Sequence, residues 1–375
     1  MGDFSPYIFD PDLERVIEAE FFVEDRYIEF DTPTFIVSPR EGVYSPEVVK
    51  DSFKRVARAF REKGFLPFLR REGGRLIIRV VKKRPSGRPS YRLNLLLLLI
   101  TIGTISLDGY LKSNIRIFTE DLMANTPVLV NTLLFLVSVL GIFGLHELAH
   151  KFVSMKENIE ASMPYFIPAP PGLGGTYGAV IIQREPPTNR DELFDLGLSG
   201  PLIGFLATVI VSIFGISLSF TVPYSKLQEW SRRYPEVAFQ PLPMPPLINL
   251  LIPLIKPIPP GQTLILHPVA FAAWVGCLIA FLNLLPIWQL DGGHISRALL
   301  GAKRHRVVSL VGLLVMVLCG FYMMAILLAF FMLRAKQDIG PLDDVSPLSL
   351  GRKILLLVYV AVLALTVTVI RPILF

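Results

Sequence analysis

The residues with the most specific chemistry in this chain are His146, Glu147 and His150, which form an H-E-x-x-H run. Because successive residues of a helix are rotated by about 100°, the two histidines share one face, and both imidazoles can bind one metal ion. Glu147 lies beside them, where its carboxylate can take a proton from a metal-bound water. Such a pattern also occurs by chance. Here it ends an uncharged run of 25 residues, 122–146, and ionisable groups at membrane depth are mostly functional, which favours a metal site.

A catalytic zinc site needs a third protein ligand and an open position for water. Asp291 directly follows an uncharged run of 34 residues, 257–290, and is the acid that we expect at the depth of His146. Gly292 and Gly293 come next, and glycine lets the backbone leave the helix and turn the carboxylate inward. Two alternatives stay open: Asp291 caps the next helix, or His294 is the ligand instead.

Two segments of the sequence together resemble a known protein family. Residues 146–150, together with residues 281–292 (FLNLLPIWQLDG), resemble the site-2 protease family of intramembrane zinc metalloproteases, which pairs H-E-x-x-H with a later N-x-x-P…D-G segment. The resemblance implies that His146, His150 and Asp291 bind Zn²⁺, that Glu147 is the general base, and that Asn283 faces the substrate or the oxyanion. It covers about residues 93–333, and residues 198–205 (LSGPLIGF) are similar to the family's Gly-Pro motif. Gln289 departs from the family, because many members have proline there.

Asn283 also has a physical interpretation of its own. It precedes Asp291 by eight residues, about two helical turns, so both side chains are expected to project to one side. An amide in a dry span needs partners and can donate to a developing oxyanion. The alternative is a hydrogen bond between helices that only packs the bundle.

The Pro- and Gly-rich segment 164–190 contains a stretch typical of a β-strand. Unwinding a substrate helix in lipid leaves its backbone groups unsatisfied, and an edge strand beside the metal can replace the lost bonds by β-augmentation. The family's membrane-re-entrant β-loop resembles this segment, and a plain connecting hairpin is the alternative. The candidate substrate-binding residues are Thr176, Tyr177, Gly178, Ala179, Val180, Ile181, Ile182 and Gln183.

Long apolar helices must position these residues. Of the 375 residues, 52% are hydrophobic and 18% are charged. A bilayer core of about 30 Å needs roughly 20 apolar residues as a helix. The chain is therefore predicted to be a polytopic α-helical membrane protein with about six transmembrane helices and a re-entrant β-hairpin-like segment. The proline-rich stretch 242–258 is expected to be a loop. The uncharged runs are 93–107, 122–146, 196–225, 257–290, 307–333 and 354–370.

Residues 1–92 have another composition and hold almost half of the charged residues. Alternation within 21–37 predicts one or two strands, Pro46 begins a helix that ends at Gly64, and 65–69 with 76–81 form a hairpin. We expect a small α+β cytoplasmic domain over 1–88 and a membrane-embedded zinc metalloprotease domain over 89–375. Because residues 1–88 contain no histidine or cysteine, this domain is expected to regulate or recruit rather than to catalyse.

The charge pattern predicts the location of the chain. The net charge is +6, and in a chain this apolar it indicates a membrane surface rather than nucleic acid. With the N-terminal domain in the cytoplasm, more basic residues flank the inner than the outer ends of the spans. We expect a multi-pass protein of the cell membrane, with this domain and the active-site opening on the cytoplasmic side. Cys277 and Cys319 lie in apolar runs and cannot form a disulfide framework.

These features predict an intramembrane zinc endopeptidase with one Zn²⁺ per chain. Its partners would be transmembrane segments of membrane-protein substrates and membrane lipid, with no nucleic acid. The cleavage would fall near the cytoplasmic side. The alternative is a non-proteolytic zinc-binding or transport protein of the membrane, which Glu147 disfavours because pure metal binding needs no base.

Overall fold

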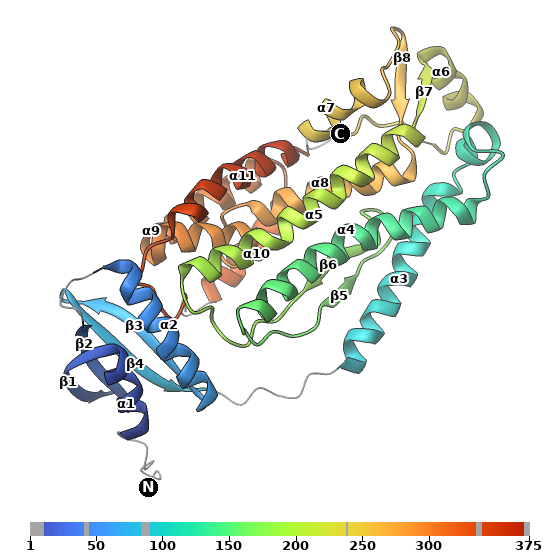
Figure 1. Ribbon diagram of the computed structural model, residues 1–375. Helices are drawn as coiled ribbons and strands as arrows, with labels where there is room; N and C mark the ends of the chain where they lie inside the picture. Colours follow the sequence, from blue (N-terminus) through green and yellow to red (C-terminus); the bar gives the residue numbers. More distant parts are fainter. Residues whose placement is uncertain (1–10, 41–44, 84–90, 238, 335–339, 371–375) are drawn as a thin grey trace.

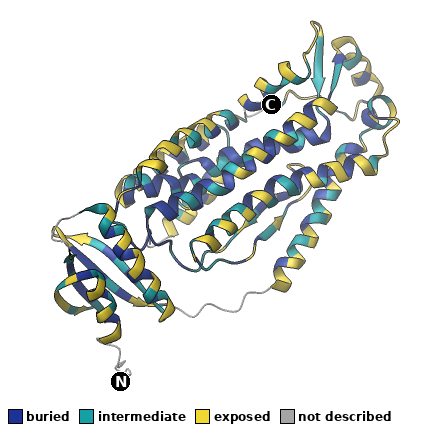
Figure 2. Cartoon of the chain, in the orientation of Figure 1, coloured by how far each residue is buried: buried dark blue, intermediate teal, exposed yellow. Residues whose placement is uncertain are grey.

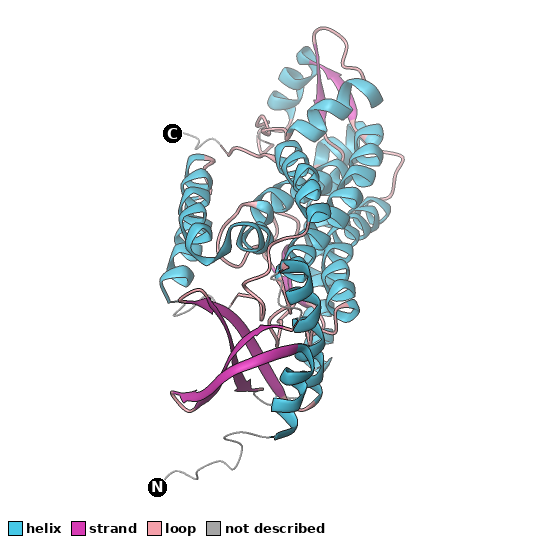
Figure 3. Ribbon diagram, turned by 60° about the vertical axis from the view of Figure 1, so that its left-hand side comes forward, coloured by secondary structure: helices cyan, strands magenta, loops and turns pink. Residues whose placement is uncertain are grey.

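A computed structural model describes residues 11–40, 45–83, 91–237, 239–334 and 340–370 of the chain, and the statements below concern these residues. It consists of a helical bundle with a small α+β domain at one end (Figure 1). One of two two-stranded sheets lies at the opposite end of the bundle (Figure 3).

The N-terminal domain is a four-stranded antiparallel sheet with two helices. The strand order is β1-β2-β4-β3, and α2 buries Val49, Phe53 and Phe60 in the core of the domain. Ser45 and Pro46 begin α2 as predicted, and the hairpin through Gly73 and Gly74 forms. The first helix, α1, was not predicted. The elements are α1 (Pro11–Glu20), β1 (Phe21–Glu29), β2 (Thr32–Pro39), α2 (Pro46–Glu62), β3 (Phe65–Glu72) and β4 (Arg75–Lys82).

The bundle is built around α5, which packs against α4, α8 and α9. Buried residues dominate α8, whereas many exposed residues lie along α3 and α11 (Figure 2). A short π-helix, η1 (Ile117–Leu122), connects α3 to α4. The helices are α3 (Tyr91–Ser113), α4 (Val128–Lys156), α5 (Arg190–Leu218), α8 (Pro268–Leu284), α9 (Asp291–Leu318), α10 (Tyr322–Arg334) and α11 (Leu350–Thr366).

By length and composition, three of the described helices could cross a membrane: α3, α4 and α5. Three further described apolar helices are shorter: α8 and α10, with 17 and 13 residues, and a helix of 10 residues at 246–255. The predicted number of six spans is therefore not confirmed. The run 307–333 is divided between α9 and α10 at Gly320, which has a left-handed backbone with φ of 91°. A side chain at this position would collide with the carbonyl of Ile370.

The stretch 242–258 contains a helix, α7 (Pro246–Ile255), so the prediction of a loop was wrong there. Pro246 stands in the first turn, where a backbone N–H would have no partner within the helix, and Pro253 falls in the last turn. At the same end of the molecule, β7 (Phe220–Pro223) pairs with β8 (Gln262–Ile265), and α6 (Tyr224–Arg233) follows β7.

A two-stranded hairpin, β5 (Tyr165–Pro168) with β6 (Thr176–Val180), contacts α3 and α4. The predicted strand 176–183 ends at Val180, opposite Tyr165. The next residue on the partner side is Pro164, which has no N–H to continue the ladder. Pairing resumes beyond it, where Ala161 bridges Gln183.

Candidate metal centre

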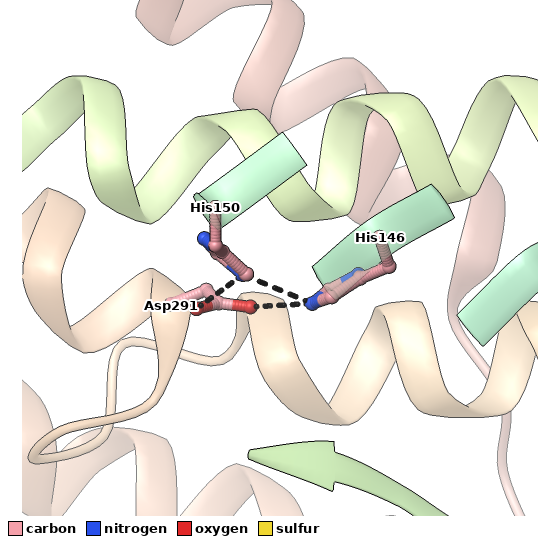
Figure 4. A group of neighbouring side chains, drawn as sticks. All are labelled: His146, His150 and Asp291. Carbon is pink, nitrogen blue, oxygen red and sulfur yellow. Dashed lines mark hydrogen bonds and ion pairs between the residues drawn. The ribbon is translucent and has the colours of Figure 1, made fainter. Parts of the chain in front are cut away.

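Two turns of α4 and the start of α9 bring His146, His150 and Asp291 together (Figure 4). The carboxylate oxygens of Asp291 lie 3.3 Å from His146 Nε2 and 3.3 Å from His150 Nε2. The two Nε2 atoms are 3.1 Å apart. Among the described residues, this is the group of His, Cys, Asp or Glu side chains whose spacing could hold a metal ion.

The hydrogen bonding of His150 fixes which of its nitrogens is free for a metal. Nδ1 donates to the carbonyl of Leu196 at 2.8 Å, so in the neutral ring the lone pair is on Nε2. That lone pair points at His146 Nε2 and at the carboxylate of Asp291, which also offer electron pairs. A shared cation would neutralise electron pairs this close, and two imidazole nitrogens with one carboxylate oxygen are a donor set for a divalent metal.

Glycines on one face of α5 make room for the centre. A methyl group at Gly200 would overlap Nε2 of His150 and lie 2.6 Å from two ring carbons. One at Gly204 would lie 3.1 Å from His146 Nδ1, and one at Gly197 would lie 2.6 Å from the backbone oxygen of Asp291. These positions, at spacings of three and four residues, let α5 pack against His146, His150 and Asp291.

The centre opens into a cavity of about 680 Å³. Glu147 and Asn283 line it together with His146, His150 and Asp291. So do Ala179, Val180, Ile181, Ile182 and Gln183, whereas Thr176, Tyr177 and Gly178 lie outside this lining. The cavity therefore joins the H-E-x-x-H residues to the second half of the predicted substrate segment.

Asn283 and Asp291 share the cavity, but the predicted reason is wrong. Since α8 ends at Leu284 and α9 starts at Asp291, a loop rather than two continuous helical turns separates them. Gly292 and Gly293 do not break a helix either, because both are in the first turn of α9. A Cβ on either glycine would collide with carbonyls of residues 284–288, so glycine is needed for close packing there. The side-chain amide of Asn283 makes no hydrogen bond to any described residue.

Sequence reasoning missed the supports of the loop that precedes Asp291. Trp288 has a left-handed backbone, with φ of 42°, and its N–H donates to Ser309 Oγ at 3.1 Å. Ser296 and His305 are hydrogen bonded at 2.8 Å and clamp α9 across its kink at Gly301. His294 lines the cavity outside the group of three.

A buried carboxylate in α3 holds the hairpin beside the cavity. Asp108 accepts from the N–H groups of Gly172 and Gly174 at 2.8 and 2.9 Å and pairs with Lys112 at 2.5 Å. Thr104, one turn earlier, donates to the carbonyl of Gly175 at 2.7 Å. The signal in the sequence was a charged residue at the end of an apolar helix.

The model of Peptidase family M50 matches residues 134–327, more than half of the chain. The chain therefore belongs to this family, which confirms the resemblance drawn from its two motifs. The match includes the H-E-x-x-H run, Asn283 and Asp291.

Curated plant proteins are similar to this chain. It is 27% identical over 328 residues to probable zinc metalloprotease EGY1, chloroplastic, of Arabidopsis thaliana, covering 79% of this chain and 57% of that protein. It is 26% identical over 219 residues to probable zinc metalloprotease EGY2, chloroplastic, of Oryza sativa subsp. indica, covering 57% of this chain and 38% of that protein. The chain thus spans less than two thirds of the length of these relatives. No solved structure matches it significantly.

Proposed function

We propose that this chain is an intramembrane zinc endopeptidase that cleaves transmembrane segments of membrane proteins. The observation that carries the proposal is that two histidines, an aspartate and the glutamate of H-E-x-x-H line one cavity in a member of a peptidase family. The relatives named as zinc metalloproteases support the metal and the reaction.

His146, His150 and Asp291 are the proposed zinc ligands. Ligand atoms about 2.1 Å from a tetrahedral zinc lie roughly 3.4 Å from one another. The three distances of 3.1, 3.3 and 3.3 Å between the nitrogens and oxygens are close to that spacing. The bound zinc would supply a Lewis acid and an activated water in its fourth position.

Glu147 is the proposed general base. It follows His146 on α4, is buried and lines the cavity, so it can reach a water beside the histidines. Its carboxylate would accept the proton of the attacking water and pass it to the leaving amine. The Asn283 amide, which has no partner among the described residues, would donate to the oxygen of the scissile carbonyl.

The segment 176–183 is the proposed substrate-binding strand. As one strand of a two-stranded hairpin, β6 pairs with β5 along one edge, and no other described strand pairs with its second edge, where an extended peptide would add. Ala179 and the residues after it line the cavity, so a peptide added there would pass the metal centre. Asp108 would keep the hairpin in place during binding.

The proposed location is the cell membrane, with the N-terminal domain and the cavity on the cytoplasmic side. The three long apolar helices support a membrane protein. The N-terminal domain, the C-terminal end of α4 and the start of α9 lie toward the same end of the bundle (Figure 1). Cleavage would therefore occur near the membrane surface that this domain faces.

Co-expression with candidate single-span membrane proteins tests the proposal. The intact chain should shorten a substrate, and Glu147→Gln should leave it intact at equal expression. If Glu147→Gln cleaves equally well, the cleavage does not depend on the proposed base, and the proposal fails. If no tested single-span protein is cleaved while purified protein holds zinc, a non-proteolytic zinc-binding or transport function is favoured.

A further inference from the structure

Residues 340–349, the described part of the connection from α10 to α11, lie between the N-terminal domain and the helix that carries Asp291. Leu342 is fully buried in the hydrophobic core of the N-terminal domain, although it is about 260 residues away from that domain in sequence. Its carbonyl accepts from the N–H of Leu69 at 2.9 Å and from Arg70 Nη1 at 2.7 Å. The connecting segment thus forms part of the edge of the N-terminal sheet.

The next residues of the same segment contact the helices of the metal centre. Leu342 and Asp343 donate through their N–H groups to the carbonyls of Pro187 and Thr188, just before α5, at 2.9 and 2.7 Å. Asp344 accepts from both terminal nitrogens of Arg297 at 3.0 and 2.9 Å. Arg190 donates to the Asp344 carboxylate at 3.2 Å and to its carbonyl at 2.8 Å.

Arg297 is on the short part of α9 that begins with Asp291. It follows Asp291 by six residues, which is about 9 Å along a helix. Gly301, with φ of 76° and ψ of 172°, interrupts α9 just afterwards, so Asp291 and Arg297 belong to one rigid segment of ten residues. Only 4% of Arg297 is exposed, and a side chain at Gly340 would collide with its guanidinium.

These contacts form one connected path. The N-terminal core holds Leu342, the two residues that follow it place Asp344, Asp344 holds Arg297, and the helical segment of Arg297 carries Asp291. A buried bidentate pair is sensitive to the loss of one partner, because the remaining charge is then uncompensated. Movement of this segment would change the distance from Asp291 to the two histidines of α4.

We propose that Arg297 is a positioning residue for Asp291, and that the N-terminal domain sets the geometry of the metal centre through Leu342 and Asp344. This inference rests on the proposed function, because it takes Asp291 as a metal ligand. It gives the N-terminal domain a role in the site without any catalytic group of its own, and makes docking of that domain a condition for tight metal binding.

Titration of the metal-free full chain with Co²⁺ tests the proposal. In Asp344→Asn, the dissociation constant should rise about tenfold, as for the loss of groups that orient metal ligands. The visible spectrum of bound Co²⁺, which reports ligand geometry, should shift, and kcat of the zinc-loaded protein should fall with KM unchanged. Asp121→Asn is the matched control, since Asp121 accepts from the Tyr234 hydroxyl at 2.9 Å and pairs with Arg233 at 3.6 Å beside α6, at the end of the bundle away from α9 and the N-terminal domain. That variant should match the wild type in affinity and spectrum.

Two further variants keep the test decisive. Arg297→Lys preserves the charge but not the bidentate contact, so its Co²⁺ affinity should fall between those of wild type and Asp344→Asn. It takes the place of Asp344→Asn if that variant does not fold. Leu342→Ala leaves the Arg297–Asp344 pair in place but loosens the domain, and should weaken Co²⁺ binding in the same direction. Wild-type affinity and spectrum in these folded variants would overturn the proposal. Asp291→Ala separates this failure from that of the proposed function: unchanged metal binding there would show that Asp291 is no ligand at all.

Discussion

Replacement of Gly200 by alanine should damage the metal centre although the side chain added is a single methyl group. The methyl would overlap His150 Nε2 and lie 2.6 Å from ring atoms Cδ2 and Cε1, whereas ordinary contacts begin at 3.4 Å. The ring must therefore move by roughly 1 Å, a displacement that at a catalytic site costs about 10²-fold in rate. Because the ring is also a proposed ligand, metal affinity should fall at least about tenfold.

The structure provides a graded series for this experiment. A methyl at Gly204 would lie 3.1 and 3.2 Å from atoms of His146, so Gly204→Ala should have a smaller effect of the same kind. Gly141, one turn before the H-E-x-x-H run in α4, has open space around its Cβ position and serves as the control. Gly141→Ala should retain metal and activity, since alanine favours a helix by about 1 kcal/mol over glycine.

The assay measures zinc content after dialysis against a weak chelator, together with cleavage of a transmembrane peptide in detergent. Gly200→Ala should lose the most zinc and activity and Gly204→Ala should lose less, whereas Gly141→Ala should lose neither. A Gly200→Ala protein that stays monodisperse with wild-type zinc and turnover would refute the argument that α5 packs against the ligands.

Three other predictions concern single acids and their neighbours. Asp291→Ala should lose zinc and activity while His294→Ala keeps both, measured by metal analysis and cleavage; the reverse result would assign the third ligand to His294. Asp108→Asn should lower cleavage with zinc content unchanged, because it weakens the hold on Gly172 and Gly174, and a wild-type rate would contradict that role. Burial raises the pKa of Asp344, but the hydrogen bond from Arg297 and the charges of Arg297 and Arg190 outweigh it and lower that pKa. The stabilisation by Asp344 should then be complete above the ordinary aspartate pKa and be lost as pH falls below it, so the melting temperatures of wild type and Asp344→Asn should converge in acid.

Local patterns in the sequence predicted the elements that bear the site. The spacing of His146 and His150 needs only a helix to place both on one face, and an uncharged run of 25 residues makes that helix predictable. The strands and the helix of the N-terminal domain followed from alternation and from the Ser45-Pro46 start. In each case, the interactions that decide the structure lie within a few residues.

What the sequence could not provide depends on contacts between distant segments. The need for glycine at position 320 is set by the carbonyl of Ile370, and that at position 200 by a ring on another helix. Leu342 packs in the core of the N-terminal domain, about 260 residues away in sequence. The sequence showed only a basic linker between that domain and the first apolar helix, and therefore predicted a separate domain. For the same reason, a count of helical turns from Asn283 to Asp291 failed, because the loop between them is held by Ser309.

The most direct test of the account is a comparison of purified wild type and Glu147→Gln, with zinc content and cleavage of a transmembrane peptide measured on the same sample. The glutamine amide cannot accept the proton of the attacking water, while His146, His150 and Asp291 are unchanged. The account predicts wild-type zinc content with no cleavage. Wild-type cleavage by the zinc-loaded variant would contradict it.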